Sequence, residues 1–177
     1  STSEEKERFI KRIGDYSKFY DLWSDYDGEK VFKLNEMNDE AELISLLIMF
    51  LKTSNHRMAI TTLGTVYQQV LDGKNNADKE FIETVKATTA FYYLWRTAFP
   101  NNGLDIAYRN YFHICFVNKK EITSQSLKEY FMSVLKEKGI RRNDWKQKAA
   151  SILKYNRSNY DFVKLALLIS STDTIPD

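Results

Sequence analysis

The sequence contains little of what disulfides, metal sites and β-sheets require. It has one cysteine, two histidines, two prolines and six glycines among 177 residues. A single cysteine excludes an intramolecular disulfide and fits a reducing compartment, and with two histidines it is too few for a zinc site built from these ligands alone. The shortage of glycine and proline argues against an all-β sandwich or barrel and against a linker-rich chain.

Long hydrophobic runs are also missing. The longest one extends from Leu43 to Leu51 and has Ser45 inside it, whereas a membrane-spanning helix needs about 20 apolar residues. The chain opens on polar and charged residues rather than on a signal peptide. Its content of 43% hydrophobic and 14% aromatic residues argues against disorder. We therefore expect a folded, cytoplasmic protein without a membrane partner.

Helical spacing of apolar residues dominates what is present. The first helix is expected to begin with a cap at Ser3. Its apolar stripe, at intervals of four, three, four and three, is Phe9, Ile13, Tyr16, Tyr20 and Trp23. Further helices are expected over 38–51, 54–71, 81–99, 104–115, 123–138, 143–153 and 158–169. Three of their starts have two candidates each, which are Asn35 or Asn38, Thr123 or Ser124, and Ser158 or Asn159. The helix over 38–51 is apolar on nearly every side, so we expect it at the centre of the fold. The sequence predicts an all-α fold, an irregular bundle of about eight helices in a single domain over residues 1–177.

The common catalytic and cofactor motifs are absent from the sequence. It contains no phosphate loop, no dinucleotide fingerprint, no H-E-x-x-H and no G-x-S-x-G. Asp25, Asp27, Gly28 and Glu29 resemble a calcium loop, but the glycine is fourth where an EF-hand needs it sixth. A solvated turn is expected there. We accordingly expect no catalytic residue, no metal and no cofactor.

The two histidines and the cysteine are expected to be structural. His56 is expected at the surface, in the first turn of a helix, and Cys115 as a small core residue. His113 is expected to be partly buried among aromatic neighbours, which are Tyr111, Phe112 and Phe116. Because His113 and Cys115 are two residues apart, a helix points them about 200° apart. They therefore cannot pair as base and nucleophile.

Two arginines are expected to form structural contacts. Asp105 and Arg109 are four residues apart on one helix, which predicts an ion pair. Arg96 lies in a largely apolar helix, where a partly buried charge needs a partner, and we expect a carboxylate.

Basic residues are concentrated toward the C-terminal end. Residues 1–42 carry a net charge of −5, whereas residues 119–164 carry +7. Residues 136–157 hold eight basic residues against two acidic ones. The candidate DNA-binding residues in this segment are Arg141, Arg142, Lys146, Lys148, Lys154 and Arg157. A helix start at Asn143 would add free N–H donors for a phosphate. The alternative is an ordinary solvated face whose lysines flank an inward stripe.

Three stretches resemble a known family. They are residues 91–109 (FYYLWRTAFPNNGLDIAYR), 162–177 (FVKLALLISSTDTIPD) and 11–20 (KRIGDYSKFY). Together they resemble the middle helical region of the GmrSD-type restriction proteins, which carry an N-terminal ParB-like nuclease domain and a C-terminal HNH nuclease domain. The Asp-Gly-Gln-Gln-Arg motif of the first domain has no match here, and the histidines of the second are absent. No catalytic residue carries over.

The resemblance implies a fragment of a bacterial restriction or anti-phage nuclease that acts on DNA and depends on a nucleotide. The expected function is that of a helical connecting or scaffold domain, which positions flanking nuclease modules and can contact DNA through residues 136–157. The alternative is a helical protein–protein interaction module with no role in nucleic-acid binding.

Overall fold

The computed structural model describes residues 2–24, 40–99, 103–139, 147 and 163–164, and all regular structure among them is helical. The helices are α1 (Ser3–Ser24), α2 (Ala41–Thr53), α3 (Met58–Leu71), α4 (Ala77–Ala98), α5 (Asp105–Val117) and α6 (Ser124–Glu137). The predicted all-α class is confirmed. Six helices are seen in the described ranges, whereas about eight are expected, and the helices expected over 143–153 and 158–169 fall almost entirely outside those ranges.

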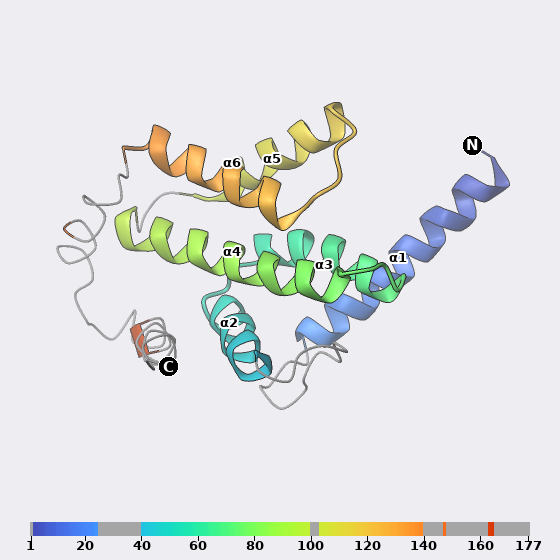
Figure 1. Cartoon of the computed structure of the whole chain (residues 1–177), viewed down its shortest axis with the longest axis horizontal. Coiled ribbons are helices and arrows are strands. Elements are labelled where there is room, and N and C mark those ends of the chain that lie inside the picture. The colour runs from blue at the N-terminus through green and yellow to red at the C-terminus, as the bar shows by residue number, and fades with distance from the viewer. Residues whose placement is uncertain (1, 25–39, 100–102, 140–146, 148–162, 165–177) are drawn as a thin grey trace.

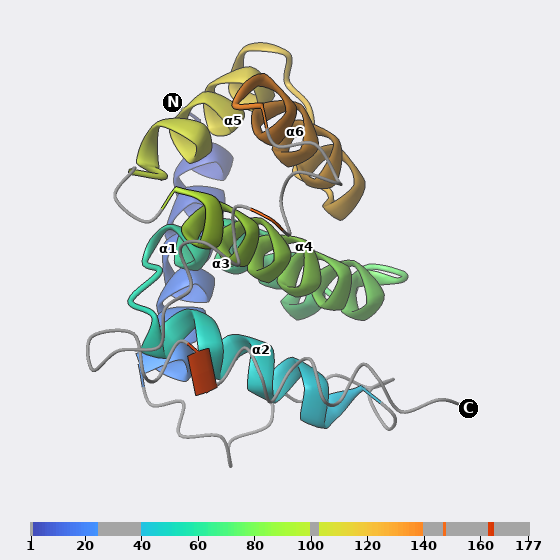
Figure 2. The same ribbon diagram turned by 90° about the vertical axis from the view of Figure 1, so that its left-hand side faces the viewer.

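Helix α4 forms the centre of the arrangement. It packs against α2, α3 and α6, with α5 and α6 on one side of it and α2 on the other (Figures 1 and 2). Helix α1 packs on α3, and α5 packs on α6. The expectation that the helix over 38–51 occupies the centre is wrong. Side chains around most of the circumference of α4 are buried, including Phe81, Val85, Phe91 and Trp95, so this helix can be covered by neighbours on several sides.

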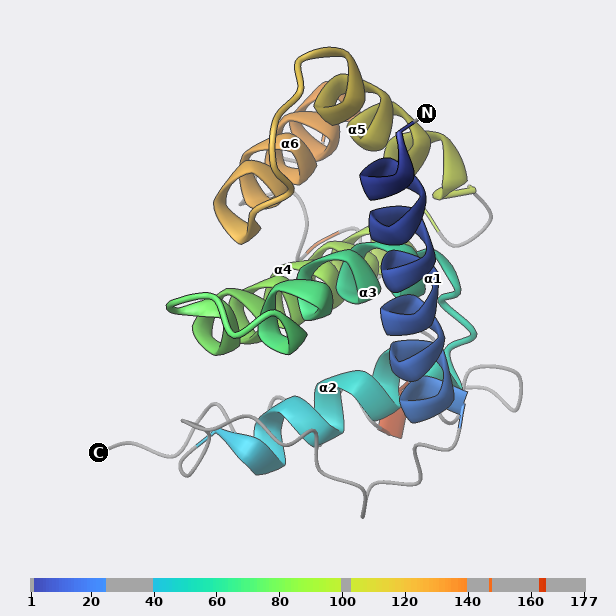
Figure 3. The same ribbon diagram turned by 90° about the vertical axis from the view of Figure 1, so that its right-hand side faces the viewer.

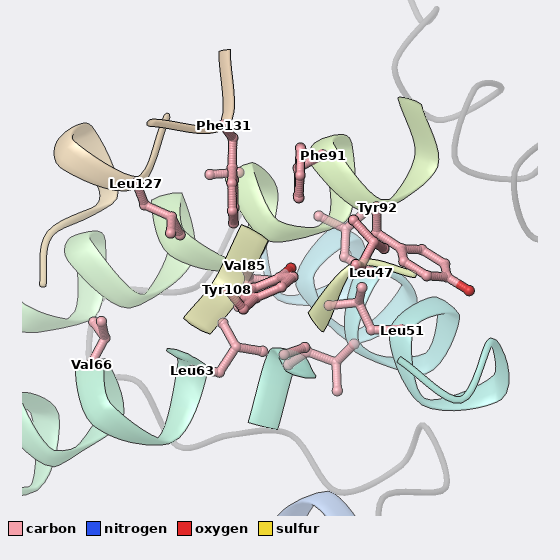
Figure 4. Close-up of a cluster of buried hydrophobic side chains, with 14 of the residues drawn as sticks. Leu47, Leu51, Leu63, Val66, Val85, Phe91, Tyr92, Tyr108, Leu127 and Phe131 are labelled. Carbon is pink, nitrogen blue, oxygen red and sulfur yellow. The ribbon is translucent and has the colours of Figure 1, made fainter. Parts of the chain in front are cut away.

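The core is rich in aromatic side chains, and Figure 4 shows how they meet between helices. The rings of Phe91 of α4 and Phe131 of α6 are stacked, with centroids 3.8 Å apart. Tyr108 of α5 lies edge-on to both rings, at 6.1 Å and 5.2 Å. Complete burial of one such side chain stabilises the fold by about 1.5–3 kcal/mol. These contacts hold α5 and α6 over α4.

Helix α1 begins one residue earlier than expected from its cap. The Thr2 hydroxyl accepts a hydrogen bond from the Glu5 amide at 3.3 Å, and the Thr2 amide donates to the Glu5 carboxylate at 2.9 Å. This reciprocal pair satisfies two backbone donors at the helix start. Thr2, rather than Ser3, is therefore the capping residue.

The predicted apolar stripe of α1 is only partly the buried face. Trp23 is buried and Tyr16 is half-buried, but Phe9, Ile13 and Tyr20 are each more than half exposed. The buried side chains are Asp15, Phe19 and Trp23. The N-terminal half of α1 extends beyond the ends of α3 and α4 (Figures 1 and 3), so none of the described helices covers its apolar residues there.

Gly64 allows α1 and α3 to approach closely. A Cβ atom at Gly64 would lie 2.9 Å from the Tyr16 ring and 3.0 Å from the Phe19 ring. Because a real Cβ does not come this close to another atom, a larger residue would separate the two helices. This contact positions the buried half of α1.

Candidate functional site

The candidate DNA-binding residues lie outside the described ranges. These are Arg141, Arg142, Lys146, Lys148, Lys154 and Arg157. At the start of the same basic segment, Lys136 and Lys138 are exposed at the C-terminal end of α6. DNA binding by the segment therefore stays a prediction from charge.

The ion pair expected on α5 is present. The Arg109 guanidinium donates to the Asp105 carboxylate at 2.7 Å. The two side chains are 71% and 52% exposed, and exposed pairs of this kind contribute only about 0.2–1 kcal/mol. The pair supports the first turns of α5, and in the described part of the chain no further ion pair joins it.

His56 is buried, and the expectation of a surface position is wrong. The reason is the way α2 ends. Asn55 has φ = 53° and follows the last turn of α2, and the His56 amide donates back to the Leu51 carbonyl at 2.9 Å. This closing motif turns the next residue toward the helix and its neighbours. Asn55 therefore ends α2 instead of capping α3, and only 4% of His56 is exposed.

The His56 imidazole belongs to a buried polar cluster between α2, α4 and α5. Its Nε2 atom and the Tyr108 hydroxyl lie 2.7 Å apart in a hydrogen bond. The Tyr92 ring lies 4.2 Å away, centroid to centroid, and its hydroxyl donates to the Ser54 carbonyl at 3.0 Å. Burial, followed by the charge of Arg96, lowers the pKa of His56 from 6.5 to about 3. The imidazole is therefore neutral at physiological pH.

The burial of this cluster indicates a structural role. Tyr108 is 1% exposed and its pKa is raised well above 10 by burial, so the phenol also stays neutral. Neither His56 nor Tyr108 is open to a substrate. Arg96, for which we expected a carboxylate partner, has its guanidinium 5.6 Å from the centroid of the Tyr92 ring, a cation–π distance.

Cys115 and His113 take different positions on α5. Cys115 is buried, as expected for a core residue. His113 is exposed, so the expectation that it is partly buried is wrong. The buried face of α5 consists of Ala107, Tyr108, Tyr111 and Cys115. Position 113 points away from this face because it is two residues from both Tyr111 and Cys115.

A groove runs between α5 and α6 and has both apolar and polar residues in its walls. It consists of two adjoining cavities of about 500 Å³ and about 300 Å³. Both are lined by Asn110 of α5 and by Tyr130, Val134 and Glu137 of α6. The larger also reaches Trp95, Gly103, Ile106, Ala107 and Lys138, and the smaller His113, Ile114 and Ser133. We call this feature the α5–α6 groove.

Helical spacing explains which side chains reach the groove. On α6, Leu127, Phe131 and Leu135 face the core, so Tyr130, Val134 and Glu137 form a second face at intervals of four and three. On α5, Ile106 and Ile114 lie beside the buried face and are 60% and 42% exposed. This second apolar stripe is the sequence signal for the groove, and it is weak because Asn110 and His113 interrupt it.

Hydrogen bonds at the start of α6 fix the two walls relative to each other. The Tyr111 hydroxyl of α5 and the Ser126 hydroxyl of α6 are 2.7 Å apart. Thr123 caps α6, with its hydroxyl accepting from the Ser126 amide at 3.2 Å. The Glu80 carboxylate of α4 accepts from the Ser124 amide and hydroxyl. These hydrogen bonds therefore fix the start of α6 relative to α4 and α5, and with it the two walls of the groove.

The polar groups of the groove include one carboxylate near a phenol. Burial, followed by the negative charge of Glu137, raises the pKa of Tyr130. Within the described ranges, Glu137 forms no ion pair. The groove can therefore offer an apolar wall, an aromatic ring and an unpaired carboxylate to a ligand.

None of the helices in the described ranges is long and apolar enough to cross a membrane. No group of three or more His, Cys, Asp or Glu side chains in these ranges could hold a metal ion. Comparison of the chain with protein-family models, with curated proteins and with solved structures found no match.

Proposed function

We propose that the chain is a helical scaffold domain that binds other protein segments in the α5–α6 groove. In the fuller form of this proposal, the domain has about eight helices and connects the nuclease modules of a larger cytoplasmic, nucleotide-dependent bacterial restriction or anti-phage protein. The domain itself would hold two modules at a fixed distance from each other.

The observation that carries the proposal is the apolar lining of the α5–α6 groove. Ile106 and Ile114 project from α5 with 60% and 42% of their surface exposed, although buried neighbours on the same helix already form the core. Together the two cavities fall in the size range of about 300–1,000 Å³ found for small-molecule pockets, which is enough room for several side chains of a partner. Exposed apolar side chains that gather in a groove are typical of protein interaction sites.

A second uncovered apolar face supports the same function. Phe9, Ile10 and Ile13 on the projecting half of α1 are 65%, 67% and 52% exposed. Lys11 of the same segment forms an exposed ion pair with Asp72 at the end of α3, and the Gln68 side chain of α3 donates to the Arg12 carbonyl at 3.2 Å. A scaffold that joins two modules needs two separate contact surfaces, and these two faces meet that need.

Contact with DNA is the second candidate function. It rests on the eight basic and two acidic residues of segment 136–157. The segment starts at the C-terminal end of α6, where Lys136 and Lys138 are exposed. A phosphate backbone would be bound through such charges without sequence readout.

The scaffold proposal is tested by selecting displayed peptides against the whole protein. Amide NMR spectra of the protein with each selected peptide then map the binding site. We expect the largest shifts at residues 106–114 and 130–137. Selection of no peptide, or mapping of the selected peptides to other surfaces, would contradict the proposal.

A further inference from the structure

We propose that the α5–α6 groove binds an amphipathic protein segment that places a lysine or arginine side chain at Glu137 and apolar side chains against Ile106 and Val134. This inference rests on the proposed function and names the chemistry of the partner.

The apolar part of the site is continuous along the groove. Val134 lines both cavities, Ile106 lines the larger one and Ile114 the smaller one. Ile106 and Ile114 are eight residues apart, which places them about two turns apart on the same side of α5. A partner helix that offers apolar side chains at matching intervals can therefore contact both.

The acidic part of the site lies where the two cavities join. Glu137 lines both cavities and has no ion-pair partner in the described structure. It is also the last residue of α6, and the C-terminal end of a helix carries a partial negative charge. Both features favour a cation at this point.

Aromatic rings extend the preference for a cation. Tyr130 lines both cavities and is half-buried, whereas Trp95 in the wall of the larger cavity is only 4% exposed and offers little more than a ring edge. The face of an exposed aromatic ring attracts ammonium and guanidinium groups by about 0.5–1 kcal/mol. A long lysine or arginine side chain can lay its methylene groups on Tyr130 while its charged end reaches Glu137.

Two basic or titratable groups also border the groove. Lys138 lines only the larger cavity, and His113 only the smaller. Both side chains are exposed, so they can turn toward solvent when a cation binds. Glu137 lines both cavities, whereas each of these groups lines only one, so the contact proposed for the partner's basic residue is Glu137.

The test compares two designed helical peptides of about 18 residues, long enough to form a helix when bound. Both carry the same leucine stripe, and their polar faces carry lysine in one peptide and glutamate in the other. Binding to the full chain is followed by amide NMR and by fluorescence anisotropy. We expect the lysine peptide to shift residues 106–114 and 130–137 and to bind at least ten-fold more tightly than the glutamate peptide.

Substitution of Glu137 then tests the named contact. Glu137→Gln keeps the shape of the side chain and removes its charge; because Glu137 is exposed, we expect a loss of affinity for the lysine peptide of about two- to five-fold. Glu129→Gln is the matched control on the same helix. Glu129 is exposed and accepts a hydrogen bond from Gln125 at 2.7 Å, outside the groove. We expect it to leave the affinity unchanged.

The possible outcomes separate the inference from the proposed function. Equal binding of both peptides in the groove would overturn the cation preference and leave the scaffold proposal standing. Shifts confined to other surfaces, or no binding by either peptide, would overturn both.

Discussion

At the residue scale, His56 is buried because of the backbone conformation at the end of α2 and not because of its residue type. Asn55 adopts a left-handed conformation that ends α2, and the next side chain then enters the core beside Tyr108. From sequence, Asn55 and His56 look like the beginning of α3, because asparagine is common at both helix ends. The choice between the two ends depends on contacts with α4 and α5, which local sequence does not contain.

The buried imidazole predicts a loss of stability in acid. The pKa of His56 is about 3 in the fold and 6.5 when exposed, so its contribution is complete above pH 6.5 and is lost as the pH falls toward 3. Between pH 6.5 and 5, we expect this residue alone to reduce the free energy of unfolding by up to about 1.4 kcal/mol per pH unit.

Urea unfolding at pH 7, 6 and 5 measures this effect. His56→Gln is the control variant, because glutamine can bond to Tyr108 but does not titrate. We expect a flatter dependence on pH for the variant in this window. Equal slopes for the two proteins would show that His56 is not held neutral by the fold.

Two glycines in helices predict opposite responses to the same substitution. Gly64→Ala would force its Cβ against Tyr16 and Phe19, and we expect a loss of about 1–2 kcal/mol after the better helix propensity of alanine is included. At Gly14 a Cβ would have no atom within 4 Å, so Gly14→Ala should stabilise by about 0.5–1 kcal/mol. Chemical denaturation of both variants tests the α1–α3 packing. A stabilising Gly64→Ala would contradict it.

At the element scale, the sequence predicts where helices form better than which face of each is buried. The expected opening of a helix at Thr123 or Ser124 agrees with the structure, in which Thr123 is the N-cap of α6. The stripe expected for α1 was partly wrong, since Phe9, Ile13 and Tyr20 are exposed. Periodicity shows that a helix has an apolar face, but the neighbours that cover it are distant in sequence.

The cap of α6 can be tested directly. Thr123→Ala removes the hydroxyl that accepts from the Ser126 amide, and we expect a loss of about 1 kcal/mol in the free energy of unfolding. Thr61→Ala is the control, because Thr61 is exposed within α3 and alanine is the better helix former. We expect no loss there. Equal losses for both variants would contradict the capping role.

At the scale of the whole molecule, the α5–α6 groove arises from contacts between distant segments. Glu80 of α4 bonds to Ser124 at the start of α6, 44 residues later, and Phe91 stacks on Phe131, 40 residues later. The sequence shows Ile106, Ile114 and Glu137 but not that they line one groove. All-α class could be predicted from spacing and composition, whereas the candidate site required the packing.

Charge at the C-terminal end of the chain predicts how any DNA binding depends on salt. If Arg141, Arg142, Lys146 and Lys148 each meet a phosphate, affinity should fall with a log–log slope of about −0.9 for each contact. Reversal of all four charges should then flatten the slope by about 3–4 units. Titration of a labelled duplex from low to moderate salt tests this. No binding at about 50 mM salt, or a slope that ignores the substitutions, would favour a scaffold without a DNA contact.

The central claim is that the α5–α6 groove is a protein-binding surface. It is tested most directly by the dissociation constant of a selected peptide for Ile106→Asp and Met132→Asp. Both side chains are exposed, at 60% and 64%, so both variants should fold, but only Ile106 lines the groove. We predict at least a ten-fold loss of affinity for Ile106→Asp and less than a two-fold change for Met132→Asp. Equal affinities for the two variants would contradict the claim.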